Sequence, residues 1–453
     1  MKTMAITSDS YVNVSVREKI GYGLGDMASN LSFGFVSLFL LFFYTNVCGI
    51  TAVQASLIFV IARVLDALFN ICIGYVIDKT NTRYGKLRPY LLFGAVPLGM
   101  LTVLCFSTFS DEFKFYYALI SYTLYCLAYT AVNTPYSAMT NTLTQHEGSR
   151  ASLSVYRIVM AIVGYMLVST TADLLISPFT DKKMGYMFAV SSFSLIATVL
   201  FLACFSMTRE RVKSQPAQKA PTLKEMVSAV SGNLPLINLS AFTMFFYIAY
   251  TVWMAIAVYF IKYTLGDETF TTQFFLIQSV AYMAGTIASE KLISMMGKKR
   301  MAQFALLIGI LGMLFQYFLA GSNGTLIMTG VCLFSLTLGM GSVAMWSMIP
   351  DTVEYAEWKQ GVRAEGAIYG YFNFITKVAM AIGGGAAGLM LDFFDYSSDH
   401  LSASALNGIN VMMTLFPALM FALSMLFIFF YTLDENTYRN IIKDIQLRNL
   451  NAQ

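Results

Sequence analysis

Residues 186–207 read YMFAVSSFSLIATVLFLACFSM, a run of 22 positions without a charged side chain. A helix of that length measures about 33 Å, enough to cross the ~30 Å hydrocarbon core of a bilayer. The run therefore predicts a membrane-spanning helix. Similar apolar runs recur along the whole 453-residue chain, so the sequence predicts a protein that crosses the membrane many times.

The composition agrees with a membrane protein. Hydrophobic residues make up 57% of the chain and charged residues 12%, against about 25% charged in soluble domains. The six cysteines stand singly, and the two histidines, His146 and His400, lie in expected loops. These patterns support neither a disulfide framework nor a metal or catalytic site. We therefore expect that the protein is not an enzyme, that it does not bind nucleic acid and that it is embedded in a lipid bilayer.

The hydropathy pattern predicts twelve spanning helices in an all-α membrane protein. Their ranges are 24–47, 52–77, 89–109, 115–138, 151–176, 186–207, 236–262, 271–294, 302–320, 324–349, 366–391 and 408–431. An even number of spans puts both termini on one side. Lys and Arg concentrate in the loops of that side, for example 79–88 and 298–300, which predicts cytoplasmic termini in a multi-pass protein of the cell inner membrane.

The longest polar stretch between spans divides the chain into two groups of six helices. We expect an N-terminal six-helix bundle over 1–207, a cytoplasmic linker over 208–235, a C-terminal six-helix bundle over 236–432 and a cytoplasmic tail over 433–453. This layout is typical of the major facilitator fold. The basic loop DKTNTRYGKLRPY after the second span is similar to MMGKKRM after the eighth, as an internal repeat would predict. The alternative is that any cytoplasmic loop tends to be basic.

Ionisable residues inside spans are costly, so each needs a partner or a cavity. One face of the second span carries Arg63, Asp66 and Asn70. These residues either line a polar cavity or include a purely structural ion pair between Arg63 and Asp66. Lys377 shares a stripe with Asn373 in the eleventh span. We expect Lys377 to face Asp66; the alternative is that it only braces the two bundles.

Neutral amides and hydroxyls on spans 1 and 4 suit a polyhydroxylated ligand, because they donate and accept hydrogen bonds without an unpaired charge. Asn30 and Asn133 are the main candidates, and Arg157 on span 5 could hold hydroxyls or a carboxylate. Asp26 could cap or pair locally. Three aromatic residues are candidates either for stacking on a sugar ring or for packing between helices: Tyr129, Trp253 and Trp346.

Four segments together resemble the glycoside–pentoside–hexuronide:cation symporter family. They are REKIGYGLGD at 17–26, DKTNTRYGKLRPY at 78–90, PDTVEYAEWKQGVRAEG at 350–366 and YTLDENTYRNIIKDIQ at 431–446. The resemblance implies alternating access driven by a monovalent cation gradient. By motif it places the cation site at Asp66, Asn70 and Thr130, and the sugar-gripping positions at Asn30 and Asn133; it also matches Arg157 and Lys377.

This sequence departs from the melibiose-permease-like pattern where that pattern has aspartates. Asn70 replaces the second acid of the cation site, which removes a negative charge that a hard cation prefers. Proton coupling and uncoupled facilitation are therefore alternatives to sodium coupling. Asn30 and Asn133, beside Arg157, suggest the hypothesis of an anionic substrate such as a uronide or a sulfonated glycoside; neutral pentosides and xylosides are also open.

The sequence thus predicts a secondary transporter that imports a sugar, glycoside or hexuronide-type substrate, coupled to H⁺ or Na⁺ and without another cofactor, and acting as a monomer. The alternatives are an uncoupled facilitator, a lysolipid or lipophile carrier, and a non-transporting sensor or membrane enzyme. The predicted substrate-binding residues are Asn30, Tyr129, Asn133, Arg157 and Asn373. The predicted coupling residues are Asp66, Asn70, Thr130 and Lys377, and the predicted cytoplasmic gate is Arg83, Asp351, Glu357 and Arg363.

Overall fold

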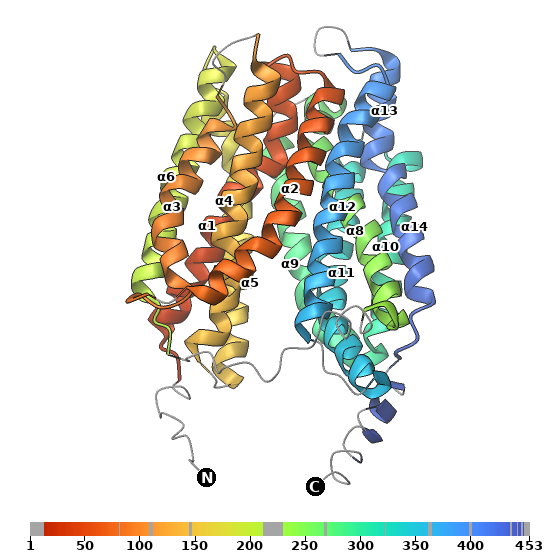
Figure 1. Ribbon diagram of the computed structural model, residues 1–453. Helices are drawn as coiled ribbons and strands as arrows, with labels where there is room; N and C mark the ends of the chain where they lie inside the picture. Colours follow the sequence, from red (N-terminus) through yellow and green to blue (C-terminus); the bar gives the residue numbers. More distant parts are fainter. Residues whose placement is uncertain are drawn as a thin grey trace. The chain divides into compact units, whose positions relative to one another are not determined.

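The computed structural model describes residues 13–80, 82–107, 112–144, 147–211, 230–266, 270–321, 323–360, 365–397, 401–434, 437–441, 443–444 and 447. In those ranges the chain is almost entirely helical, as Figure 1 shows. It divides into two compact units, Met1–Ala217 and Gln218–Gln453. The boundary between them falls inside the expected linker, 208–235.

The described part of the first unit contains six long helices. They are α1 (Val16–Phe42), which continues as a π-helix over Phe43–Val47, α2 (Ala52–Lys79), α3 (Arg88–Leu104), α4 (Lys114–Leu143), α5 (Glu147–Ile176) and α6 (Lys182–Met207). Helix α1 packs on α5 and α6, α4 packs on α2 and α3, and α3 packs on α6. Gly164 lets α5 approach α1 closely, since a Cβ there would lie 2.6 Å from the Met27 carbonyl oxygen.

The second unit repeats this arrangement. Its helices are α8 (Leu234–Phe260), which continues as a π-helix over Ile261–Leu265, α9 (Phe270–Met296), α10 (Lys298–Leu319), α11 (Gly324–Gln360), α12 (Glu365–Phe393), α13 (Ala403–Met413) and α14 (Leu415–Phe429). Helix α8 packs on α12 and α14, α11 packs on α9 and α10, and α10 packs on α14. Each of these contacts has its counterpart in the first unit, which makes α10 the equivalent of α3.

Side-chain caps explain where several helices begin. The Ser15 hydroxyl accepts a hydrogen bond from the Glu18 amide at the start of α1. Thr51 and Gln54 form a reciprocal capping box at the start of α2. Asn233 accepts from the Leu236 amide at the start of α8, with Pro235 in the first turn.

The helices agree with the expected spans in number but not in every boundary. Ten described helical stretches are long and apolar enough to cross a membrane, and α3 is a shorter apolar helix. Helix α9 coincides with the expected span 271–294 but is not among these ten. The twelfth span, expected over 408–431, is broken at Thr414 into α13 and α14. Helix α11 runs through Pro350 to Gln360, beyond the expected end at 349. The described chain is a multi-pass membrane protein.

Candidate functional site

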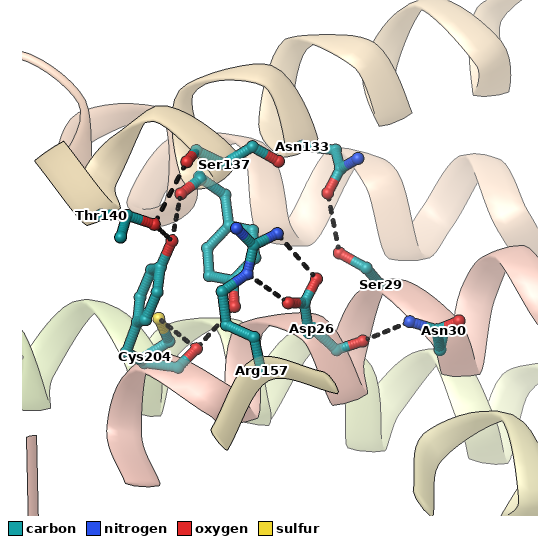
Figure 2. Close-up of polar contacts among 10 residues, drawn as sticks. Asp26, Ser29, Asn30, Asn133, Ser137, Thr140, Arg157 and Cys204 are labelled. Carbon is teal, nitrogen blue, oxygen red and sulfur yellow. Dashed lines mark hydrogen bonds and ion pairs between the residues drawn. The ribbon is translucent and has the colours of Figure 1, made fainter. Parts of the chain in front are cut away.

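An ion pair joins α1 to α5 within the first unit. The Arg157 Nε donates to Asp26 Oδ2 at 2.5 Å, and its Nη2 donates to Oδ1 at 3.4 Å, as Figure 2 shows. The sequence suggested a local partner for Asp26 and a ligand-binding role for Arg157. Instead, the structure pairs them across two helices, so the charge of the guanidinium is balanced by a carboxylate of the protein.

Two tyrosines support the guanidinium. The Tyr22 hydroxyl donates to the Tyr136 carbonyl at 3.1 Å, and the Tyr136 hydroxyl donates to the Tyr22 carbonyl at 2.7 Å. The Arg157 Cζ lies 5.6 Å from the centre of the Tyr22 ring and 5.1 Å from that of Tyr136, within cation–π range. Gly25 makes room for this packing, because a Cβ there would overlap the Tyr136 ring. The contacts between Tyr22 and Tyr136 hold α1 against α4.

The two predicted amides, Asn30 and Asn133, both lie on the same side of the Asp26–Arg157 pair, as Figure 2 shows. Asn30 donates from Nδ2 to the Asp26 carbonyl one turn earlier at 2.9 Å, and Asn133 accepts from the Ser29 hydroxyl at 3.3 Å, also in Figure 2. Tyr129 packs on Phe33 with ring centroids 5.5 Å apart. Asn30, Tyr129 and Asn133 therefore belong to one polar and aromatic cluster on α1 and α4.

A second cluster joins α2 to α4. The Thr130 hydroxyl donates a hydrogen bond to Asp66 Oδ1, and the Thr134 hydroxyl donates to Asn70 Oδ1 at 3.3 Å. Both contacts advance by four residues on each helix, so they form two successive rungs between α2 and α4. Asp66 and Thr130 are only 2% and 3% exposed. The structure thus brings together three residues that the sequence predicts as coupling residues, and it adds Thr134.

The chemistry of this α2–α4 cluster suits a hard ion or a proton. It contains carboxylate, amide and hydroxyl oxygens, the ligand types that hard cations take in proteins. These oxygens are a fitting set for Na⁺, although Asn70 supplies an uncharged one. Arg63 lies one turn before Asp66 on α2, with its Cζ 5.8 Å from the Phe33 ring centre, and adds a positive charge to this region.

The remaining candidates lie mostly in the second unit. Asn373 is exposed and Lys377 is half-buried on α12. The Asp66–Lys377 pairing would join the two units and stays a prediction. Trp253 is fully buried between Phe334 and Phe274, with ring centroids at 4.7 and 5.5 Å, so it packs between helices.

Trp346 is 47% exposed and contacts Phe372 edge-on at 5.8 Å. Of the three aromatic residues proposed to stack on a sugar ring, it presents the most open side chain. Its exposed face, unlike that of Trp253, is available for contact with another molecule.

Two of the four predicted gate residues, Asp351 and Arg83, are held in contacts within their own unit. Asp351 accepts from Lys298 Nζ at 2.7 and 2.9 Å within the second unit. Arg83 donates to the Tyr84 hydroxyl, and its Cζ lies 4.6 Å from that ring centre. Glu357 is half-buried on α11. Arg363 lies outside the described residues, so a gate that links the two units stays a prediction.

Residues that the sequence analysis missed are Ser29, Thr134 and the role of Asp26. Thr134 follows Thr130 by four residues, the same helical spacing that marked Asp66 and Asn70, so this signal was present. Ser29 offered no signal beyond its place beside Asn30. The partner of Asp26 lies 131 residues away, and helical spacing within one span says nothing about it.

Comparison with known proteins gives concordant results. The profile of the family described as "MFS/sugar transport protein" matches residues 21–435. An uncharacterised symporter of Bacillus subtilis (strain 168) is 35% identical, over 97% of each chain. The isoprimeverose transporter of Lactiplantibacillus pentosus is 33% identical, over 92% of this chain and 89% of that protein. A glucuronide carrier protein homolog of Escherichia coli (strain K12) is 32% identical, over 96% of each chain.

Among solved structures, the crystal structure of a mutant of the nucleoside transporter NupG matches with a TM-score of 0.69 and 14% sequence identity. The match covers 92% of this chain and 100% of that one. At this identity the similarity concerns the fold alone, and this fold agrees with the one that the sequence predicts.

Proposed function

This chain belongs to the MFS/sugar transport protein family, and from that membership we propose that it imports a sugar or glycoside by alternating access, coupled to a monovalent cation. Membership confirms the predicted family resemblance and the major facilitator fold. Relatives named as an isoprimeverose transporter and a glucuronide carrier homolog support a carbohydrate-type substrate.

The buried Asp66–Thr130 contact is the observation that carries the coupling part of this proposal. A charged carboxylate at the centre of a membrane-spanning helix costs about 2.5–3.5 kcal/mol on insertion scales, so such residues are rare and typically mark functional sites. Asp66 is 2% exposed and takes a hydrogen bond from a hydroxyl on α4. Protonation of this carboxylate or binding of Na⁺ beside it would neutralise the negative charge of the site and so bias the packing of α2 against α4.

Asn30, Tyr129, Asn133 and Asn373 are our candidates for contacts with sugar hydroxyls and with an apolar ring face. The Asp26–Arg157 pair refines the substrate class. An anionic substrate would have to compete with Asp26 for a guanidinium that already forms two hydrogen bonds. We therefore propose a neutral glycoside as the preferred substrate. A uronide would bind Arg157 only by displacing the Asp26 carboxylate.

Uncoupled facilitation is the second candidate, because Asn70 is an amide where the melibiose-type pattern has an acid. With one carboxylate in the α2–α4 cluster, a cation would meet half the negative charge. The lysolipid alternative is not favoured, since the cluster residues on α1, α2 and α4 are polar and the relatives are named for sugars.

The proposed orientation has both termini in the cytoplasm of a cell whose inner membrane holds the protein as a monomer. In that orientation Arg83, Asp351, Glu357 and Arg363 lie at the cytoplasmic gate. If they hold the gate closed, Arg363→Glu should slow transport several-fold while substrate affinity stays within about twofold. A large loss of affinity would instead place the 350–366 segment in the binding site.

Counterflow in proteoliposomes tests the substrate class without requiring coupling. Vesicles preloaded with unlabelled pentosides, glycosides or glucuronides exchange against the labelled compound, for wild type, Asn133→Ala and the exposed control Asp181→Asn. We expect exchange of a neutral glycoside that Asn133→Ala weakens and Asp181→Asn does not. Exchange of lysolipid alone, or of no carbohydrate in the panel, contradicts the proposal.

A further inference from the structure

A cluster of three hydroxyls and one indole joins helices α8, α9 and α11 within the second unit. The Tyr282 hydroxyl on α9 donates to the Ser342 hydroxyl on α11 at 3.3 Å. The Tyr247 hydroxyl on α8 interacts with Tyr282 and with the Trp346 side chain on α11. We call these four residues the α8–α11 cluster, and none of them is among the sugar-binding residues proposed above.

The cluster lies at the same helix interfaces as the polar clusters of the first unit. Helices α8, α9 and α11 are the equivalents of α1, α2 and α4. The Tyr282–Ser342 hydrogen bond joins α9 to α11 as the Asp66–Thr130 hydrogen bond joins α2 to α4. The chemistry differs, because the α8–α11 cluster carries no charged side chain. Its groups therefore suit an uncharged ligand rather than a coupling ion.

The surrounding packing holds the cluster in place. Gly339 lets α11 approach α9 closely, because a Cβ there would overlap the Tyr282 carbonyl oxygen. The buried Phe372 on α12 contacts the Trp346 ring edge-on, with ring centroids 5.8 Å apart. Groups that are held in position before binding lose less conformational entropy when a ligand binds.

The exposure of the cluster indicates a polar surrounding. Tyr247, Tyr282 and Ser342 are half-buried, and Trp346 is exposed. Tyr247 and Tyr282 each lie near the middle of a 27-residue helix, whereas tyrosines that anchor a protein at lipid headgroups lie at helix ends. Hydroxyls that face hydrocarbon at that depth would lose their hydrogen bonds to water. This surface therefore favours contact with water or a polar ligand.

The four side chains together match the chemistry of a sugar ring. A hydroxyl can donate one hydrogen bond and accept two, so Tyr282 and Ser342 can each contact a ligand hydroxyl while their mutual bond persists. The exposed Trp346 ring offers an apolar surface to the C–H face of a sugar ring. Hydroxyls beside an aromatic ring thus complement both the polar edge and the apolar face of one sugar.

We infer that the α8–α11 cluster binds a second sugar ring, so that the substrate is a disaccharide-type glycoside rather than a monosaccharide. This inference rests on the proposed transport of a glycoside. In the first unit, Tyr129 with Asn30 and Asn133 already supplies an aromatic ring and two amides for one sugar. The second unit supplies a separate set of the same kind, and transporters built from two repeats take substrate contacts from both.

Competition in the counterflow assay tests this subsite. The competitors are matched series on xylose and glucose: methyl β-glycosides without a second ring, phenyl β-glycosides with an apolar ring, and the disaccharides xylobiose and cellobiose. Tyr282→Phe and Ser342→Ala each delete one hydroxyl of the cluster. Tyr317→Phe deletes a tyrosine hydroxyl on α10, outside the cluster, and is the matched control.

We expect Tyr282→Phe and Ser342→Ala to raise the inhibition constants of the disaccharides about three- to tenfold, as the loss of one neutral hydrogen bond predicts. The methyl and phenyl glycosides should change by less than about twofold, and Tyr317→Phe should change none of the three series. If Tyr282→Phe does not fold, Ser342→Ala decides the question, since it removes the other partner of the same bond.

Two results would overturn the inference while glycoside transport stands. One is unchanged competition by the disaccharides in both variants. The other is weakening of the methyl or phenyl glycosides to the same degree as the disaccharides, because the hydroxyls would then shape the site without binding a sugar ring. If no carbohydrate competes or exchanges in wild type, the proposed function itself is contradicted, and the inference with it.

Discussion

The Asp26–Arg157 pair allows a quantitative test of what holds α1 to α5. We consider Asp26→Asn, Arg157→Gln and the double variant. The two side chains are 14% and 25% exposed, so each single change leaves the other charge partly buried without its partner. Breaking a fully buried pair costs about 3–5 kcal/mol; with partial exposure we expect about 2 kcal/mol for each single variant.

Because the double variant leaves no unpaired charge, it should cost clearly less than the sum of the two single changes. A coupling energy of about 1–2 kcal/mol is expected for residues in direct contact. For a unit of this size, 2 kcal/mol corresponds to a fall in Tm of roughly 4–8 °C.

Thiol labelling during heating reads out the first unit directly. Its cysteines Cys48, Cys105, Cys126 and Cys204 are buried, so a fluorogenic thiol reagent reacts with them only on unfolding. The exposed Cys72 and the half-buried Cys332 of the second unit are replaced by serine in every variant, and Asp181→Asn serves as the surface control. Strictly additive losses, or single variants as stable as the control, would refute the reasoning that this pair stabilises α1 against α5.

Three further predictions follow from individual contacts. Thr130→Val should abolish cation-dependent uptake while Thr130→Ser retains it within a fewfold, because only serine keeps the hydroxyl that binds Asp66; equal uptake by both variants would remove Thr130 from the coupling site. Gly25→Ala should lower stability by about 1–3 kcal/mol in the thiol assay, since its Cβ would overlap Tyr136; an unchanged Tm would show that the ring can move aside. The Thr437 hydroxyl and amide hold the pKa of Asp434 below its usual value, so this stabilisation is full above the ordinary carboxyl pKa and is lost as pH falls through the lowered pKa. The Tm difference between wild type and Asp434→Asn should therefore shrink below about pH 4, and a difference that grows on acidification would contradict the assignment.

The sequence predicted helix number and order well, because hydropathy over about 20 residues measures the feature that the bilayer selects. It was weaker at helix ends. Helix α1 begins at Val16, well before the expected 24, since the Ser15 cap and the polar first turns lie beyond the apolar run. The break at Thr414 was also missed, because the apolar pattern continues through both α13 and α14.

For the candidate site, spacing along one helix identified groups but not their partners. Asp66 and Asn70 share a face of α2, and the structure confirms that this face meets Thr130 on α4. The partner of Arg157 could not be predicted, because nothing in the α5 sequence indicates which turn of α1 it approaches. That approach depends on small residues such as Gly23 and Gly164, where a Cβ would lie 3.0 Å from the Tyr156 carbonyl oxygen and 2.6 Å from the Met27 carbonyl oxygen.

Gradient-driven accumulation tests the central claim most directly. Labelled glycoside uptake into proteoliposomes is measured under an imposed Na⁺ gradient, an imposed proton gradient and neither, for wild type and Asp66→Asn. A cation-coupled importer accumulates the sugar above equilibrium under one gradient, while Asp66→Asn retains only downhill flux. If wild type merely equilibrates its substrate under both gradients, coupling is contradicted and the protein is a facilitator.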